Sequence, residues 1–203
     1  MIQAAVPGLV LASGSASRRA LLEGAGLRFE VEAAAVDEAS IKEACQAEAI
    51  SPGDAAIILA EAKAERVARR RPEALVIGGD QLLVCEGRWF DKPPDLAAAR
   101  TQLLALRGKR HELVSGTVAW RGGERVWHYI TISRLTMREF SEAFLEDYLA
   151  LEGERLLASV GGYRLEGPGV QLFTKVEGDH SAILGLPLFP LLGFLRQHSV
   201  LIY

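Results

Sequence analysis

The order of apolar and polar positions along the chain predicts short strands that alternate with amphipathic helices. Apolar runs predict strands at Leu9–Ala12, Phe29–Ala34, Leu75–Val84, His111–Trp120, Val126–Met137 and Val170–Val176. Capping residues and prolines predict helices at about Ser17–Gly24, from Ser51 towards Arg71, from Pro93 to near Gly108, at Ser141–Leu151 and at Leu188–Gln197. The alternation lacks strict βαβ regularity, which favours a mixed α/β sheet with a central cleft.

Composition narrows the class of protein only slightly. The 203 residues allow one large domain or two lobes that share a cleft. The net charge of −3 gives no general attraction to nucleic acid, and the arginines between Arg66 and Arg71 lie at a helix end, where cations complement the dipole. Cys45 and Cys85 match no disulfide framework or metal motif. With no signal-like segment and no run long enough to span a bilayer, we expect a cytoplasmic protein that binds neither a nucleic-acid polymer nor a membrane.

The loop Ser13–Arg19 follows the first apolar run and leads into a helix. Free backbone N–H groups, small hydroxyl residues and arginines suit a phosphate group. Ser and Gly are also common in strand-to-helix turns simply because they cap helices well. Arg18 and Arg19, however, place positive charge at a helix start, where it opposes the dipole, and an anionic ligand would resolve that conflict.

Asp80 is the most informative single residue, because it lies inside the apolar run Leu75–Val84 directly after Gly78 and Gly79. A carboxylate enclosed in such a run is normally paired or bound to metal, and the glycines allow a ligand or a second backbone to approach. The alternative is a tight Gly-Gly-Asp turn between two short strands. Glu38, in an acidic pair after Val36, could supply a second carboxylate to the same metal or could simply be solvated.

Further charged residues have two interpretations each. Lys63 falls on the otherwise apolar helical stripe of Ala56, Leu59 and Val67, so it either extends to solvent at the rim or points into a cleft. Lys92, before a helix start, could neutralise a phosphate or lie in solvent. Glu166 stands in a glycine-rich loop, Tyr163–Gly169, whose glycines permit close approach to a flat ligand. No Ser-His-Asp arrangement, nucleophilic cysteine motif or zinc pattern is present in the sequence.

Taken in order, these motifs resemble the Maf family of nucleoside triphosphate pyrophosphatases over residues 9 to 195. The resemblance rests on Ser13-x-Ser15-x-x-Arg18 with Leu21-Leu22, Glu61-Ala62-Lys63-Ala64, Gly79-Asp80, Lys92-Pro93, Gly108-x-x-His111, Tyr163-x-x-x-Gly167, Gly178 and Gly185-Leu186-Pro187-Leu188. Each motif is modest alone, but the ordered set is specific.

The resemblance implies a single Maf-like domain, residues 1–203, with two lobes around a cleft. Its fold would be an elongated mixed sheet flanked by helices, similar to that of inosine triphosphate pyrophosphatases. It also implies hydrolysis of a nucleoside triphosphate to monophosphate and pyrophosphate with Mg²⁺ or Mn²⁺. By matching position, Asp80 would be the catalytic carboxylate and, with Glu38, would hold the metal. The substrate-binding residues would be Ser13, Ser15, Arg18, Lys63, Gln81, Lys92 and Glu166. The resemblance leaves open whether the protein forms a homodimer.

The family's branches differ at positions that bear on base choice. The branch that hydrolyses dTTP and UTP has Thr at the position of Gln81 and Gln at that of Glu166, whereas the 7-methyl-GTP branch has Gln and Glu there, as this chain does. Ser17 matches neither branch, which carry Arg and Trp respectively. The family's Asp-Lys pair shortly before the Tyr-Gly loop is replaced by Ala158-Ser159, a departure that bears on activity.

The sequence therefore predicts a metal-dependent nucleoside triphosphate pyrophosphatase in nucleotide-pool sanitation, closer to the 7-methyl-GTP branch. The rival hypothesis is a non-catalytic nucleotide-binding regulator of cell division. The presence of Glu38, Lys63, Asp80 and Lys92 together favours the enzyme, because a protein that only binds nucleotide does not need the carboxylates.

Overall fold

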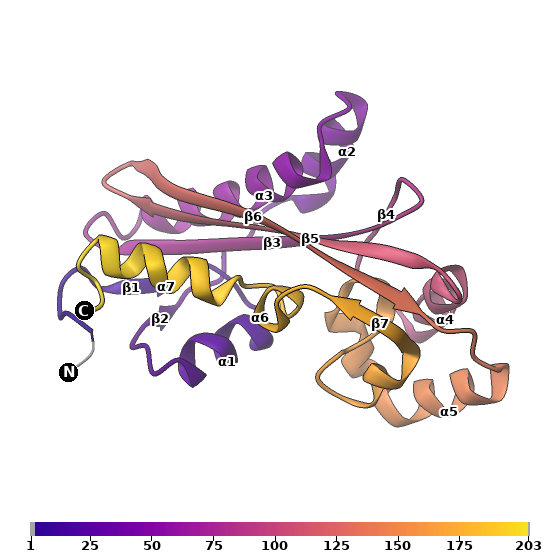
Figure 1. The fold of residues 1–203 in the computed structure, drawn as a ribbon. Helices are drawn as coiled ribbons and strands as arrows, with labels where there is room; N and C mark the ends of the chain where they lie inside the picture. The colour runs from indigo at the N-terminus through magenta and orange to yellow at the C-terminus, as the bar shows by residue number, and fades with distance from the viewer. Residues whose placement is uncertain (1–2, 203) are drawn as a thin grey trace. The chain divides into compact units, whose positions relative to one another are not determined.

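The computed structural model describes residues 3–202 and shows a mixed α/β fold (Figure 1). Its described strands form a seven-stranded sheet in the order β2-β1-β3-β5-β6-β7, with β4 paired to β3. The strands are β1 Leu9–Leu11, β2 Glu30–Val31, β3 Leu75–Cys85, β4 Arg88–Phe90, β5 Arg110–Arg121, β6 Glu124–Met137 and β7 Phe173–Glu177. Strand β1 pairs parallel with β2 and β3, whereas β3–β4 and β6–β7 are antiparallel. The expected mixed sheet is confirmed.

Most helices begin and end where the sequence predicts, because side-chain caps mark their first turns. Ser15, Ser51, Asp95 and Ser141 each accept a backbone N–H of the helix that follows. The helices are α1 Ala16–Gly24, α2 Glu38–Ala47, α3 Pro52–Ala68, α4 Leu96–Leu106, α5 Glu142–Glu152, α6 His180–Ile183 and α7 Leu188–Gln197, with 3₁₀ turns η1 Gly153–Ala158, η2 Val160–Gly162 and η3 Pro168–Leu172. Within residues 3–202, no helix is both long and apolar enough to cross a bilayer.

Three expectations about local structure were wrong. Helix α2 was not predicted; Asp37 caps it through the Ser40 N–H, so the acidic pair begins a helix and does not lie in an open loop. The predicted strand Phe29–Ala34 reduces to the two residues of β2. The start of the predicted strand Val170–Val176 is instead the 3₁₀ turn η3. The Gly-Gly-Asp turn is excluded, because Gly78, Gly79 and Asp80 continue β3 without a break.

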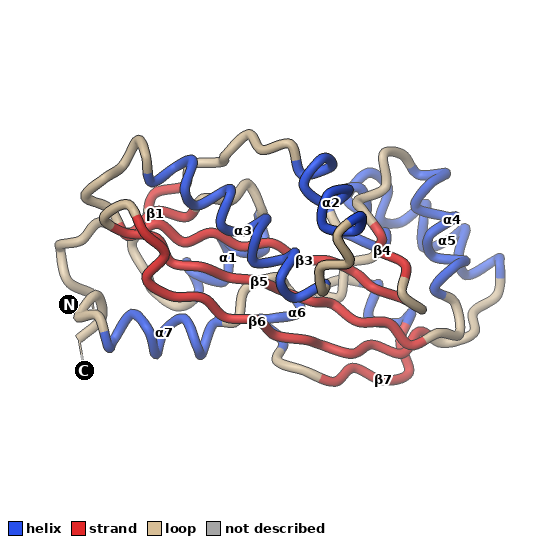
Figure 2. Tube along the Cα trace, turned by 90° about the horizontal axis from the view of Figure 1, so that it is seen from above, coloured by secondary structure: helices blue, strands red, loops and turns tan. Residues whose placement is uncertain are grey.

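The chain divides into two compact units. Unit 1 comprises Met1–Asp80, Ser115–Thr131 and Asp179–Tyr203, and unit 2 comprises Gln81–Val114 and Ile132–Gly178. In unit 1, helix α3 covers one face of the strands, and α1 and α7 cover the other (Figures 1 and 2). Because both faces are covered, β1 is buried along its whole length.

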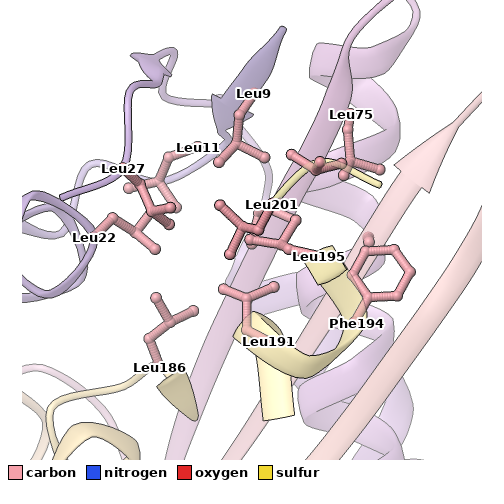
Figure 3. Packing of buried hydrophobic residues seen from close by; sticks show 13 residues of the cluster. Leu9, Leu11, Leu22, Leu27, Leu75, Leu186, Leu191, Phe194, Leu195 and Leu201 are labelled. Carbon is pink, nitrogen blue, oxygen red and sulfur yellow. The ribbon is translucent and has the colours of Figure 1, made fainter. Parts of the chain in front are cut away.

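Alternation along the strands of unit 1 divides its apolar side chains between two cores. Leu9 and Leu11 point towards α1 and α7 and pack with Leu22, Leu191 and other apolar side chains (Figure 3). The intervening strand positions face α3; this second core contains Val10, Ala12, Val76, Val118, Ile57, Ala60, Ala64 and Val67. Burial of this kind stabilises the folded chain by roughly 25 cal/mol per Å² of apolar surface.

Two glycines allow α3 to lie unusually close to the strands beneath it. A Cβ at Gly78 on β3 would overlap the Ala60 carbonyl oxygen, and a Cβ at Gly116 on β5 would overlap the backbone at Ala56. Side chains one turn further along α3 therefore reach the strand directly. This close approach places Lys63 against Asp80.

Unit 2 contains helices α4 and α5, the 3₁₀ turns, and the ends of the long strands. Helices α4 and α5 contact each other, and Arg100 on α4 pairs with Glu142 and Glu146 on α5. Gly161 and Gly162, both with positive φ, lie tightly against side chains and backbone of the same unit. These contacts position the segment that leads into the Tyr163–Gly169 loop.

Candidate functional site

Lys63 joins two carboxylates from separate elements of unit 1. Its Nζ lies 2.5 Å from Asp80 Oδ1 and 2.8 Å from Glu38 Oε1. Lys63 and Asp80 are buried, whereas the Glu38 side chain is 44% exposed. The rim interpretation of Lys63 was therefore wrong, and the lysine points inward. Glu38 is in the first turn of α2, where its negative charge also complements the helix dipole.

Asp80 keeps one carboxylate oxygen without a partner. Its Oδ2 is buried and accepts no hydrogen bond from any of residues 3–202. A buried acceptor left unsatisfied costs free energy, so native proteins normally pair it with protein, water or a bound ion. The orphan oxygen, with Glu38 nearby on the same lysine, fits a hard divalent cation.

The carboxylates do not form a complete protein cage for a metal. Across the described chain, no group of three or more His, Cys, Asp or Glu side chains is placed to hold one ion. Mg²⁺ commonly binds one or two carboxylates and takes its other ligands from water and substrate phosphates. The pair Asp80 and Glu38 matches that pattern.

Arg18 is enclosed by three segments of unit 1. Its Nε donates to the Gly185 carbonyl at 2.8 Å and its Nη1 donates to Ser13 Oγ at 3.0 Å. A Cβ at Gly79 or Gly185 would lie 3.3 or 3.1 Å from that Nε, so both glycines make room for the guanidinium. Burial lowers the pKa of Arg18, and the charges of Asp80 and Glu38 act in the opposite direction. The residue remains a cation beside the carboxylates.

The residues of the Ser13–Arg19 loop have different contacts. Ser15 Oγ accepts the Arg18 N–H and so caps α1, while Ser13 Oγ accepts from Arg18 and from the Ser15 N–H. Arg19 is exposed and pairs with Glu23 along the same helix. The loop therefore directs one buried cation, Arg18, towards Asp80. The serines can cap the helix and still form part of a phosphate site, so the two interpretations of this loop do not exclude each other.

The remaining predicted site residues belong to unit 2. Gln81 follows Asp80 in β3 and is half-buried, and Lys92 is exposed before α4. Glu166 is an exposed residue whose side chain is 30% exposed, and its Oε1 lies 3.6 Å from Arg164 Nε. The structure thus brings together Ser13, Ser15, Arg18, Glu38, Lys63 and Asp80 within unit 1.

Sequence reasoning did not find the partners that hold these residues. The Gly185 carbonyl appeared only as part of a motif, and the ion pair between Glu152 and Arg164 gave no local signal. His111 entered the sequence analysis only through the motif Gly108-x-x-His111, and the structure places its Nε2 2.8 Å from the Tyr163 hydroxyl in the buried part of unit 2.

Burial lowers the pKa of His111 from 6.5 to about 4. Between these values the unfolded chain binds more protons than the folded one, so the free energy of unfolding rises with pH in that range. We expect His111 to account for about 3 kcal/mol of stability that is present above pH 6.5 and lost as pH falls to 4. Urea unfolding from pH 4 to 8 should show a flatter dependence for His111→Gln. An equally steep profile would contradict this assignment, and His128→Gln, at an exposed position, is the control.

Comparison with known proteins shows which family the chain matches. The model of the family described as "Maf-like protein" matches residues 8–198. The chain is 58% identical over 193 residues to a "Nucleoside triphosphate pyrophosphatase" of Granulibacter bethesdensis, covering 95% of this chain and 98% of the relative. It is 48% identical over 191 residues to a "7-methyl-GTP pyrophosphatase" of Rhizobium meliloti, covering 94% and 96%.

A solved structure of a "Nucleoside-triphosphatase / dITP/XTP pyrophosphatase" from Mycobacterium abscessus is a more distant match. It is 17% identical, with a TM-score of 0.42, and the match covers 66% of this chain and 75% of that one. A likeness at this level carries no argument about the site.

Proposed function

The chain belongs to the Maf family and is a nucleoside triphosphate pyrophosphatase, and from this premise we propose that Arg18, Lys63 and Asp80 carry out its chemistry. The proposed reaction is hydrolysis of a purine nucleoside triphosphate, including an N7-methylated one, to monophosphate and pyrophosphate. The observation that carries the proposal is the buried Asp80 carboxylate, which Lys63 holds by one oxygen while the other has no described partner.

Asp80 and Glu38 are the residues that would hold a divalent cation, Mg²⁺ or Mn²⁺. The orphan Oδ2 of Asp80 supports this role, and the half-exposed Glu38 offers a second oxygen ligand. A bound cation would supply neutralisation of phosphate charge and polarisation of water. Asp80 would orient the attacking water and accept its proton, because burial and the contact with Lys63 hold its carboxylate in one orientation.

Lys63 and Arg18 supply positive charge for the phosphates. Both are buried and both lie beside carboxylates of unit 1, so their charges are held in place before substrate binds. Preorganised charge stabilises a transition state more than charge that must rearrange. Ser13 and Ser15 shape the loop that holds Arg18. The proposed roles of Gln81, Lys92 and Glu166 rest on the family resemblance.

The decisive experiment is a pyrophosphate-release assay over a panel of nucleoside triphosphates, each with Mg²⁺, with Mn²⁺ and with chelator. We expect turnover that needs the cation, with a purine or N7-methylated purine substrate ahead of dTTP and UTP. Cation-independent turnover would contradict the metal assignment. A clear lead of dTTP or UTP would contradict the base assignment and leave the general activity standing.

Arg18→Ala is expected to raise KM and lower kcat together, because a phosphate contact acts in both the ground state and the transition state. It also removes buried hydrogen bonds to Ser13 and Gly185, so the free energy of unfolding should fall by about 2 kcal/mol. Steady-state kinetics and urea unfolding measure the two effects. Arg19→Ala is the matched control, since Arg19 is exposed and pairs only along its own helix in the described contacts. Equal effects of both changes would exclude a specific role for Arg18.

Glu166→Gln is expected to reduce the preference for an N7-methylated purine by about tenfold. A 7-methylated guanine ring is cationic, and the carboxylate favours positive charge where the neutral amide does not. Competition between 7-methyl-GTP and GTP measures the ratio of their kcat/KM values directly. An unchanged ratio would remove Glu166 from base selection.

A further inference from the structure

The carbonyl that holds Arg18 lies in the short turn between α6 and α7 (Figure 1). Arg18 Nε donates to this Gly185 carbonyl at 2.8 Å, and Arg18 Nη1 donates to Ser13 Oγ at 3.0 Å. Gly185 has a φ of 97°, a value that glycine adopts without strain. The direction of the Arg18 guanidinium therefore depends on how the rest of the chain holds this turn.

Ser181, in α6, closes the turn at two points. Its backbone carbonyl accepts the Leu186 N–H at 3.0 Å, and its hydroxyl oxygen accepts the Leu188 N–H at 2.9 Å. The Leu186 N–H and the Gly185 carbonyl belong to one planar peptide group and point in opposite directions. A contact that fixes this N–H consequently also fixes the carbonyl that Arg18 uses.

The Ser181 hydroxyl also joins the starts of two helices. It donates to Asp179 Oδ1, the N-cap of α6, which accepts the Ala182 N–H at 2.9 Å as well. It accepts from Leu188, the first residue of α7, whose own N-cap Pro187 provides no side-chain acceptor. Ser181 is buried, so loss of its hydroxyl would leave the Leu188 N–H without a ready replacement.

We propose that Ser181 is a positioning residue for Arg18, and that its hydroxyl keeps the Gly185 carbonyl directed at the guanidinium. Ser181 acts through the turn between α6 and α7 and not through a contact with substrate. The kinetic consequence of this inference rests on the proposed function, in which Arg18 supplies charge to the phosphates. The positioning of Arg18 itself can be measured without any substrate.

Burial makes Arg18 sensitive to the position of its acceptors. Because water is scarce around the guanidinium, its charge depends on fixed hydrogen-bond acceptors, and the same burial lowers its pKa. If the Gly185 carbonyl turned away, the guanidinium would reorient towards another acceptor. Its five N–H donors lie in one plane, so the donors that face a phosphate would move with it. A misplacement of about 1 Å in a positioned group can cost ~10² in rate.

The first test observes Arg18 directly in the full-length protein. With ¹⁵N in the arginine side chains, the Arg18 Nε–H signal is identified by its absence from the spectrum of Arg18→Lys. We expect Ser181→Ala to speed exchange of this N–H with solvent by about tenfold, because its acceptor is held less firmly. Ser141→Ala is the matched control, since the Ser141 hydroxyl accepts the Phe144 N–H at the start of α5 in unit 2. The control should leave the exchange rate at its wild-type value.

The second test is a kinetic cycle of wild type, Ser181→Ala, Arg18→Ala and the double variant, with the substrate that the nucleotide panel selects and saturating Mg²⁺. We expect Ser181→Ala to lower kcat/KM by about tenfold, with KM raised and kcat lowered together. In the Arg18→Ala background, Ser181→Ala should have no further effect on kcat/KM. A merely structural loss of folded protein would lower kcat and leave KM unchanged, and Ser141→Ala should show at most that change.

The outcomes separate the inference from the proposed function. Unchanged Nε–H exchange in Ser181→Ala would overturn the inference and leave the proposed function standing. An undiminished effect of Ser181→Ala on kcat/KM in the Arg18→Ala background would also overturn it, because Ser181 would then act by a route that excludes Arg18. Turnover unaffected by Arg18→Ala would overturn the proposed role of Arg18, and the Nε–H exchange would decide the positioning by itself. Equal effects of Ser181→Ala and Ser141→Ala in both tests would make Ser181 a helix cap alone, which contradicts the inference.

Discussion

Asp80→Asn is expected to lower kcat of pyrophosphate release by ~10² or more while the protein stays folded. The asparagine has nearly the same shape and its amide oxygen can still accept from Lys63, so local packing is preserved. It lacks the charge that holds a cation and accepts a proton. Steady-state kinetics with saturating Mg²⁺ or Mn²⁺ measure the loss of kcat, and circular dichroism measures whether the protein stays folded.

A matched control for this prediction is Asp147→Asn on α5. Asp147 is exposed, so the same chemical change there should leave kcat near its wild-type value. Near wild-type turnover in Asp80→Asn would remove Asp80 from the mechanism. Loss of turnover in both variants would show that the effect is not specific to the buried carboxylate.

Lys63→Met is expected to lower kcat/KM by ~10² and to make stability depend on the divalent cation. Methionine retains an apolar stem but leaves Asp80 buried beside Glu38 without the ammonium that joins them. An unpaired buried charge costs about 3 kcal/mol, so the cation-free variant should unfold more readily. Mg²⁺ or Mn²⁺ should restore much of that loss, because a cation held by Asp80 and Glu38 would neutralise the two carboxylates that lose the Lys63 ammonium.

Thermal unfolding with and without cation measures this effect, and isothermal titration should show tighter cation binding by the nucleotide-free variant than by wild type. Arg66→Met is the control, since Arg66 is an exposed cation on the same helix. If cation addition stabilises Lys63→Met no more than wild type, Asp80 and Glu38 do not hold the ion. That result would leave Lys63 as a structural partner of the two carboxylates.

Local sequence signals predicted most helices and strands of this protein. Serine and aspartate caps marked the helix starts, and Leu188–Gln197 forms α7 as expected. The same local reasoning missed α2 because Asp37 and Glu38 resemble a solvated loop, and it overextended β2 because a run of apolar residues does not show where strand pairing stops. Pairing depends on neighbours that are distant in sequence.

The sequence by itself determined that a carboxylate, Asp80, lies inside an apolar run and that a loop with Arg18 leads into a helix, and it left a tight turn at Asp80 open. Only the tertiary structure decided which charges meet. Lys63 reaches Asp80 because Gly78 lets α3 approach the strand, and Arg18 is fixed by the Gly185 carbonyl, 167 residues away along the chain. Periodicity reports which face of an element is apolar, whereas an ion pair depends on how two separate elements pack.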